Sequence, residues 1–359
     1  MNATHPPRAT ERVPSTVVLG ASGYLGSVIG GLLASRPGRV RLVARRPCAV
    51  PEGAVATVET VRADLTDDAA VAAAVADADV VLHLAKHAGD WRLPEREPAA
   101  TGQVNVGVMR ALLAALAARS GASGAGTDAG DPARPPLVVF AGACTQIGHT
   151  PDRPMDGTEP DHPETAYDQQ KLAAENLLME ATRVGAVRGV SLRLATVFGQ
   201  SPLSAVPDAG VVVTMIRKAL AGEPLTMWHD GTVMRDLTYV EDVGRAFLAA
   251  VDRPEGLIGR HWMIGTGRHE PLGEVFRTVA SAVAAATGLP PVPVVTVTPP
   301  GAAVVTDFLN VYIDPAPFGA ACGWSARVPL REGIDRTVHA LLSAGPLPGS
   351  PVQSTAPTP

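Results

Sequence analysis

The stretch VVLGASGYLG, residues 17–26, runs from a β-branched apolar segment directly into glycines at positions 20, 23 and 26. Glycines at this spacing let a strand turn tightly into a helix and let the backbone approach a pyrophosphate, whose charge rests on the exposed amides of the helix N-terminus. A tight turn with no ligand could use the same residues, so the flanking elements decide. We predict a dinucleotide-binding turn formed by Gly20, Ser22, Gly23, Tyr24, Leu25 and Gly26.

Short β-branched runs alternate with helical patterns on the C-terminal side of this turn. Strands are predicted at residues 15–20, 39–44, 79–85, 137–142 and 189–197, and the main helices start at residue 24, near residue 108 and at residue 166. Alternating strands and helices are typical of βαβ units in a parallel sheet that is covered on both faces. The predicted fold class is therefore α/β, a Rossmann-like doubly wound parallel sheet with a smaller C-terminal α+β substrate domain.

Composition shifts suggest where these parts begin and end. We predict a disordered tail at residues 1–14, a Rossmann domain at 15–199 with a flexible loop at 120–136, a mainly substrate-binding region at 200–343, and a second tail at 344–359. Residues 236–265 are expected to return to the Rossmann domain.

Charge and cysteine content narrow the class of protein. The 359 residues carry a formal net charge of -5, which disfavours nucleic-acid binding because counterion release needs clustered positive charge. Three scattered cysteines and nine histidines without ligand spacing predict no disulfide framework and no metal site. No uninterrupted apolar run suggests a membrane span, so we expect a cytoplasmic protein with a small-molecule partner. Apolar helices around Met109 and Leu177 would suit either a homodimer or the core.

The segment LVARRP, residues 42–47, bears on the choice of dinucleotide. An NAD site would want a carboxylate here for the ribose 2′-hydroxyl, whereas Arg45 and Arg46 can pair with a 2′-phosphate through charge-assisted hydrogen bonds. The predicted cofactor is therefore NADPH/NADP+. Two arginines facing only water would give the same pattern.

The segment YDQQK, residues 167–171, supplies a candidate acid. Tyr167 and Lys171 are four residues apart in a helical stretch, so they share one face and the ammonium should lie close to the phenol. A nearby positive charge would lower the tyrosine pKa toward working pH. A plain helix surface can carry the same pair, but here it follows a dinucleotide-binding pattern.

Together these motifs resemble the extended short-chain dehydrogenase/reductases, from Thr16 to about His339. The resemblance implies that Tyr167 and Lys171 are catalytic and that Arg235, in RDLTYVEDV, binds the substrate diphosphate. Trp228 could wall the nucleotide pocket, and Thr196 stands where many relatives have an asparagine that touches the diphosphate. The implied cofactor contacts beyond the glycines are Asp64 and Leu65 at the adenine, Leu84, Ala85 and Lys86 after a strand, and Asn105, which should open the fourth helix.

Within that group, the segments FAGACTQIG, AYDQQKLAAENLL and SLRLATVFG resemble the 4-ketoreductases of TDP-deoxysugar biosynthesis. This resemblance implies reduction of the C-4 ketone of a TDP-linked keto-deoxysugar by NADPH. Cys144 and Thr145 replace the acidic pair of sugar 4,6-dehydratases, which disfavours elimination. Two alternatives remain: a regulatory protein that binds NADP(H) without catalysis, and an enzyme that acts on another ketone.

One expected hydroxyl is absent. Relatives carry a serine or threonine five residues before the glycine that ends this segment, and alignment on Gly148 places Ala143 there. Alanine cannot donate a hydrogen bond to the substrate oxygen. Because side chains alternate along a strand, Thr145 should point to the same side as Ala143 and supply the hydroxyl, although a β-branched residue also simply suits a strand.

Overall fold

The computed structural model describes residues 13–87, 93–123, 134–204, 208–228, 230–299 and 307–343, with side chains of 120–123 left aside. The predicted tails at 1–14 and 344–359 and the predicted loop at 120–136 lie wholly or mostly outside the described residues.

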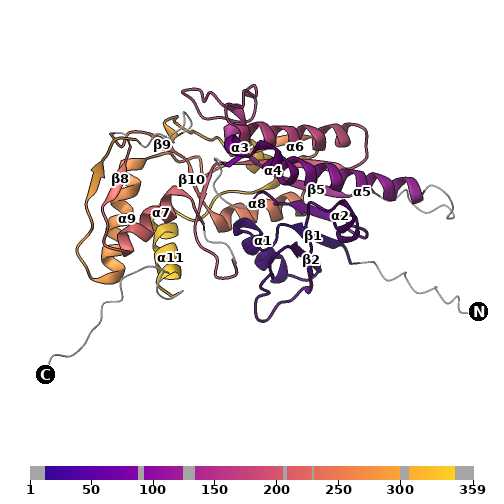
Figure 1. Cartoon of the computed structure of the whole chain (residues 1–359), viewed down its shortest axis with the longest axis horizontal. Helices are drawn as coiled ribbons and strands as arrows, with labels where there is room; N and C mark the ends of the chain where they lie inside the picture. The colour runs from indigo at the N-terminus through magenta and orange to yellow at the C-terminus, as the bar shows by residue number, and fades with distance from the viewer. Residues whose placement is uncertain are drawn as a thin grey trace, which may run out of the picture.

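A seven-stranded sheet forms the centre of the larger part of the molecule (Figure 1). The strand order is β3-β2-β1-β4-β5-β6-β11, and every neighbouring pair is parallel. This confirms the predicted Rossmann-like sheet, and β3 and β11 extend it at its two edges. The strands are β1 (Ser15–Leu19), β2 (Arg39–Ala44), β3 (Thr57–Arg62), β4 (Val80–His83), β5 (Leu137–Ala143), β6 (Arg188–Leu194) and β11 (Arg260–Ile264).

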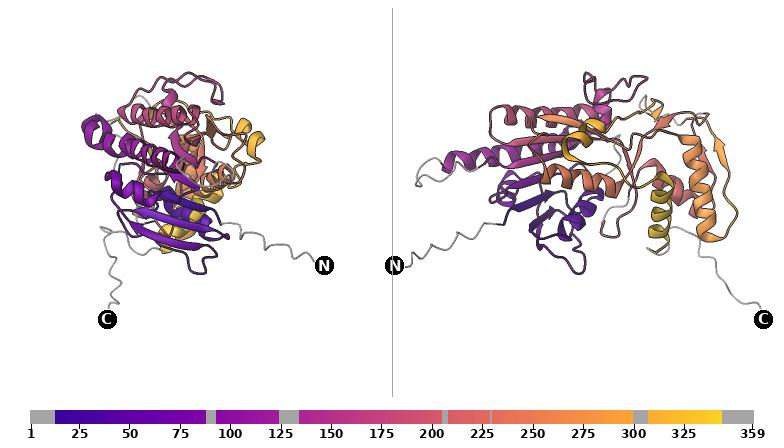
Figure 2. Two further views of the ribbon diagram at one scale, coloured as in Figure 1. Left: turned by 90° about the vertical axis from the view of Figure 1, so that its right-hand side faces the viewer. Right: turned by 180° about the vertical axis from the view of Figure 1, so that it is seen from behind.

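Helices cover both faces because alternate residues of each strand point to opposite sides. Val17 and Leu19 face a core shared with α2 (Asp68–Ala74), α5 (Val108–Ser123) and α6 (Ala166–Arg183). Val18 faces a second core shared with α1 (Tyr24–Ala34) and α8 (Val240–Asp252). Figures 1 and 2 show these layers from three sides.

A single helical stretch enters α5 through α4 (Pro98–Gly102) and a π-helical turn, η1 (Gln103–Gly107), with the short α3 (Leu93–Arg96) before them. Residues Pro98–Arg119 of this stretch are long and apolar enough in composition to cross a membrane, which the sequence analysis did not anticipate. Met109, Leu112 and Leu116 are completely buried against the sheet. One face of the stretch therefore packs into the core.

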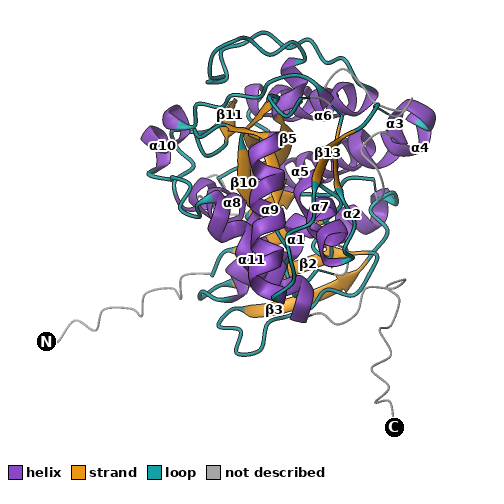
Figure 3. Ribbon diagram, turned by 90° about the vertical axis from the view of Figure 1, so that its left-hand side faces the viewer, coloured by secondary structure: helices purple, strands orange, loops and turns teal. Residues whose placement is uncertain are grey.

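The later part of the chain builds a second, smaller core beside the sheet. Figure 3 views the molecule from this side, with α9 (Leu272–Thr287) and α11 (Leu330–Ser343) in front of the strands. Val213, Ile216, Val275 and Val279 are fully buried between the helices. The remaining elements of this part are α7 (Val211–Leu220), α10 (Ala316–Cys322), β7 (Thr196–Phe198), β8 (Leu225–Met227), β9 (Met234–Arg235), β10 (Leu237–Tyr239), β12 (Glu270–Pro271) and β13 (Val294–Thr296).

The carboxyl ends of β1, β4, β5 and β6 all lie at one edge of the sheet, because these strands are parallel. Strand order reverses between β1 and β4, and open parallel sheets bind ligands at such a switch point. Gly20 and Leu84 directly follow β1 and β4, and Ala143 ends β5, so these predicted site residues lie at this edge.

Candidate active site

The glycine turn after β1 is held by main-chain hydrogen bonds. The amides of Gly20 and Ala21 donate to the Val43 carbonyl at 2.9 and 3.1 Å, and the Gly23 amide donates to the Gly20 carbonyl at 3.0 Å. Gly20 has a φ of +89°, which favours glycine. The turn thereby ties the start of α1 to the end of β2.

Two of the three glycines have no room for a side chain. A Cβ on Gly20 would lie 2.8 Å from the Ala85 amide nitrogen, and one on Gly26 would lie 2.3 Å from the Gly20 carbonyl oxygen. The N-cap of α1 is Gly23, which has no side chain to cap the first amides, and the first turn of α1 has no acidic residue. The first amides of α1 are thus suited to an anion, and the turn fits the pyrophosphate of a dinucleotide.

The end of β2 leads from this turn to two exposed arginines, Arg45 and Arg46. Asp64, after β3, is exposed, and Leu65 is buried beneath it. Hydrogen bonds from the Thr66 amide and hydroxyl, at 3.0 and 2.8 Å, together with the charge of Arg45, hold the pKa of the Asp64 carboxyl below its ordinary value. Because β2 and β3 are neighbouring parallel strands, Arg45 and Asp64 follow strand ends at the same edge of the sheet.

Asn105 lies in the π-helical turn η1, not at the start of a helix as predicted, because the helix already begins at Pro98. The π turn brings the buried Asn105 into the site. Its Oδ1 accepts from the His87 amide at 2.8 Å, and its Nδ2 donates to Gln170 Oε1 at 2.7 Å. Asn105 thus joins the segment after β4, where Leu84 and Ala85 are buried and Lys86 is exposed, to Gln170 on α6.

Tyr167 and Lys171 lie on the first two turns of α6. Lys171 is buried, and its Nζ donates to the Ala141 carbonyl at 2.8 Å and lies 5.8 Å from the centre of the Tyr167 ring. Burial and the charge of Lys86 lower the pKa of Lys171 to about 7.

The predicted lowering of the Tyr167 pKa is wrong. Burial raises the pKa of the phenol, and the Asp168 carboxyl, when ionised, adds to the shift. The Lys171 ammonium is directed to the end of β5, and so it does not offset them. Tyr167 is therefore a protonated phenol, which can donate a proton to a substrate oxygen.

The predicted strand position of Thr145 is also wrong. Strand β5 ends at Ala143, and Cys144–Ile147 form a 3-10 turn, η2, so the strand alternation does not apply. The Thr145 hydroxyl donates to the carboxylate of Asp168, the residue after Tyr167. Thr145 is half-buried, and through Asp168 it is joined to the first turn of α6.

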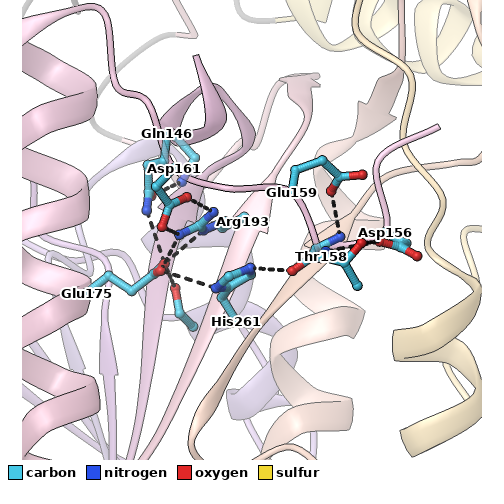
Figure 4. Close-up of polar contacts among 11 residues, drawn as sticks. Gln146, Asp156, Thr158, Glu159, Asp161, Glu175, Arg193 and His261 are labelled. Atoms are coloured by element: carbon cyan, nitrogen blue, oxygen red, sulfur yellow. Dashed lines mark hydrogen bonds and ion pairs between the residues drawn. The ribbon is translucent and has the colours of Figure 1, made fainter. Parts of the chain in front are cut away.

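A largely buried polar network holds Gln146 of η2 in place (Figure 4). Gln146 Oε1 accepts from the Ala143 amide at 2.8 Å, and its Nε2 donates to Glu175 Oε2 at 3.1 Å. Glu175 also pairs with Arg193, which in turn pairs with Asp161 at 2.6 Å. His261 completes the network through Glu175 and the Gly157 carbonyl. These interactions fix the turn that carries Thr145.

Three further residues of the predicted site lie in the second part of the chain. The buried guanidinium of Arg235 donates to the carbonyls of Asp307, Leu309 and Met234. Thr196 begins β7 and pairs with Leu237, and Trp228 follows β8.

Cys144, the first residue of η2, is buried, and burial with the charges of Asp168 and Asp236 raises the pKa of its thiol to about 12. The thiol stays protonated.

The structure thus brings Thr145, Tyr167 and Lys171 together on η2 and α6, and places Gly20 against Ala85. Sequence reasoning missed Asp168, Gln146 and Glu175. An acid directly after Tyr167 was a visible signal for Asp168, whereas Gln146 and Glu175 gave none. Among the described residues, no group of three or more histidine, cysteine, aspartate or glutamate side chains could hold a metal ion.

Residues 16–265 match the model of the NAD dependent epimerase/dehydratase family. The chain belongs to this family. The matched region contains the glycine turn, η2, the start of α6 and Arg235.

The names of two relatives describe enzymes that act on nucleotide sugars. The UDP-glucose 4-epimerase of Mycolicibacterium smegmatis is 28% identical over 333 residues, covering 90% of this chain and 97% of that protein. The dTDP-6-deoxy-L-talose 4-dehydrogenase (NAD(P)(+)) of Kitasatospora kifunensis is 26% identical over 340 residues, covering 92% of this chain and 96% of that protein.

Solved structures of family members show the same architecture. A Thermus thermophilus UDP-glucose 4-epimerase in complex with NAD has 27% identity and a TM-score of 0.73, and the match covers 92% of this chain and 100% of that chain. MoeE5 in complex with UDP-glucose and NAD has 27% identity and a TM-score of 0.73, with 92% and 99% covered.

Proposed function

We propose that this protein reduces the C-4 ketone of a TDP-4-keto-6-deoxyhexose with NADPH. The observation that carries the proposal is the grouping of Tyr167, Lys171 and Thr145 on α6 and η2, with Tyr167 held as a protonated phenol. A protonated phenol suits the reductive direction, in which the substrate oxygen must receive a proton.

The residues of this chain fit a nicotinamide dinucleotide. The amides at the start of α1 would hold the pyrophosphate, and Asp64 and Leu65 would hold the adenine. Arg45 and Arg46 are exposed at the end of β2, where they can reach a ribose 2′-phosphate and favour NADPH over NADH. When bound, NADPH supplies the hydride that the ketone carbon accepts.

Tyr167 would donate its proton to the C-4 oxygen as negative charge develops there. Lys171 would stabilise the resulting phenolate, since it lies on the same helical face one turn away. This requires the ammonium to leave the Ala141 carbonyl, a contact that water or a cofactor hydroxyl can replace. Thr145 would donate the second hydrogen bond to the oxygen in place of the absent side chain at Ala143.

The substrate class rests on Arg235 and on the Kitasatospora relative. Arg235 lies on β9 in the second part of the chain, and its guanidinium could exchange the backbone carbonyls for a diphosphate. The name of the relative describes oxidation at carbon 4 of a dTDP-linked 6-deoxyhexose, the reverse of the proposed reduction.

The test is NADPH oxidation, followed by nicotinamide absorbance, with TDP-4-keto-6-deoxyglucose and its 2-deoxy analogue. We expect turnover that is faster with NADPH than with NADH and that is lost in Tyr167→Phe. Conversion of UDP-glucose to UDP-galactose with no keto-sugar reduction would contradict the proposal and favour an epimerase. Cofactor binding without any turnover would favour a regulatory role.

A further inference from the structure

Asp168 is a buried carboxylate inside the candidate site that the proposed mechanism does not yet use. It is the third residue of α6 and 1% exposed, and it directly follows Tyr167. Its side chain faces two hydroxyl groups, from Thr145 on η2 and from Thr165, the N-cap of α6.

The directions of these hydrogen bonds depend on the Asp168 amide and on the protonation of the Asp168 carboxyl. The Asp168 amide donates to Thr165 Oγ1 at 3.1 Å, so the Thr165 hydroxyl proton is available for Asp168 Oδ2, 2.6 Å away. The Thr145 hydroxyl meets Asp168 Oδ1. An ionised carboxylate accepts only, so both hydroxyls must then donate to Asp168.

This arrangement conflicts with the role of Thr145 in the proposed reaction. A threonine hydroxyl has one proton, and while that proton is held by Asp168 it cannot reach a substrate oxygen. A protonated Asp168 removes the conflict. Its acid proton can be donated to Thr145 Oγ1, and the Thr145 proton is then directed elsewhere.

We propose that Asp168 is a positioning residue whose protonated form donates to Thr145 and thereby turns the Thr145 hydroxyl toward the C-4 oxygen of the substrate. The inference rests on the proposed ketone reduction. Thr145 and Asp168 together then replace the single hydroxyl that Ala143 lacks.

The surroundings favour the protonated form. Burial raises the pKa of Asp168, and the charges of Glu164, from the loop before α6, and Glu95, from α3, act in the same direction, while the two threonine hydroxyls oppose it. Cys144 and Tyr167 also face Asp168, and both are neutral because their own pKa values are raised. Negative charge on the substrate oxygen would favour protonation further.

The first experiment measures kcat/KM for TDP-4-keto-6-deoxyglucose between pH 5 and 9 in wild type and Asp168→Asn. Asparagine can donate to Thr145 permanently through its amide, so the variant mimics the protonated acid. The ratio of variant to wild type should rise with pH, by about tenfold per unit above the Asp168 pKa. Titration of Lys171 affects both proteins and cancels in the ratio.

The matched control repeats the comparison in a Thr145→Val background, where the ratio should be independent of pH. A ratio that is flat in the native background, or that rises equally in both, would overturn the inference. Rescue of high-pH activity by Asn, and its dependence on Thr145, is a result that a merely structural role for Asp168 would not produce.

A ligand-free measurement separates this inference from the proposed function. Because the folded pKa of Asp168 is raised, the native state loses stability relative to Asp168→Asn as pH rises from about 4 through that pKa. The difference in urea midpoint between variant and wild type should therefore grow in favour of the variant. If the keto-sugar is not reduced but this growth occurs, the proposed substrate is wrong and the protonation of Asp168 is supported. A constant difference would contradict it.

Discussion

The glycine turn after β1 and the 3-10 turn η2 after β5 lie at the same edge of the sheet but are held in different ways. Main-chain bonds and missing side chains define the glycine turn: Gly20 binds Val43, and Gly26 leaves no space for a methyl group. Side chains from distant segments define η2: Gln146 reaches Glu175, and Thr145 reaches Asp168.

This difference explains how the two turns can vary. A turn that depends on backbone contacts tolerates almost no substitution at its glycines. A turn held by side-chain hydrogen bonds can exchange one hydroxyl for another if the partners change together. Loss of a hydroxyl at Ala143 is therefore compatible with retained chemistry.

The largest effect on activity should come from substitution of Tyr167, the proposed proton donor. Tyr167→Phe removes the proton donor and should lower kcat/KM by roughly a thousandfold, since general acid catalysis contributes on the order of 10²–10⁴. Cofactor affinity, measured by quenching of protein fluorescence with NADPH, should remain within about twofold. A variant with more than a tenth of wild-type activity would remove Tyr167 from the mechanism.

A substitution in the glycine turn tests its backbone character. In Gly26→Ala the new methyl group would meet the Gly20 carbonyl and Ala21 Cα, so we expect a loss of about 3 kcal/mol in unfolding free energy and weakened NADPH binding. Gly256→Ala is the matched control, because a Cβ there has only ordinary contacts at 3.8 Å or more and the residue is exposed. Equal stability of the two variants would break the comparison.

The pKa of Lys171 gives a stability prediction at the side-chain end of the site. Its folded pKa of about 7 lies below the ordinary value of 10.5, so the native state binds fewer protons than the unfolded state between these values and its stability rises with pH. Lys171→Met lacks this dependence. Its stability relative to wild type should fall by about 4 kcal/mol from pH 6 to pH 10 in urea unfolding. A stability difference that does not change with pH would indicate that the Lys171 ammonium is exposed to water in the folded protein.

Cofactor preference should change with the arginines at the end of β2. Arg45→Ala with Arg46→Ala removes the charge-assisted bonds proposed for the 2′-phosphate and should lower the NADPH to NADH preference by about tenfold to a hundredfold. NADH affinity should remain nearly unchanged, because the glycine turn would bind the pyrophosphate that both cofactors share. An unaltered NADPH to NADH preference would show that Arg45 and Arg46 are solvent-exposed side chains with no contact to the cofactor.

The same contrast limits what the sequence could predict. The parallel sheet, the glycine turn and the Tyr167–Lys171 helix followed from patterns within a few residues, since strand period, glycine spacing and helix period are local. The 3-10 turn at Thr145 was not predicted, because its geometry depends on Gln146, Glu175 and Asp168, which meet only in the folded protein. The raised pKa of Tyr167 has the same origin, because burial and the direction of Lys171 are not visible in the spacing.

The central claim is that Thr145 supplies the hydroxyl absent at Ala143, and a rescue experiment tests it most directly. We would measure kcat/KM for keto-sugar reduction in Thr145→Val, Ala143→Ser and the double variant. Thr145→Val should lose on the order of a hundredfold, and Ala143→Ser in the same chain should restore most of that loss by returning a donor to the end of β5. Full activity of Thr145→Val, or a double variant no better than Thr145→Val, would contradict the claim.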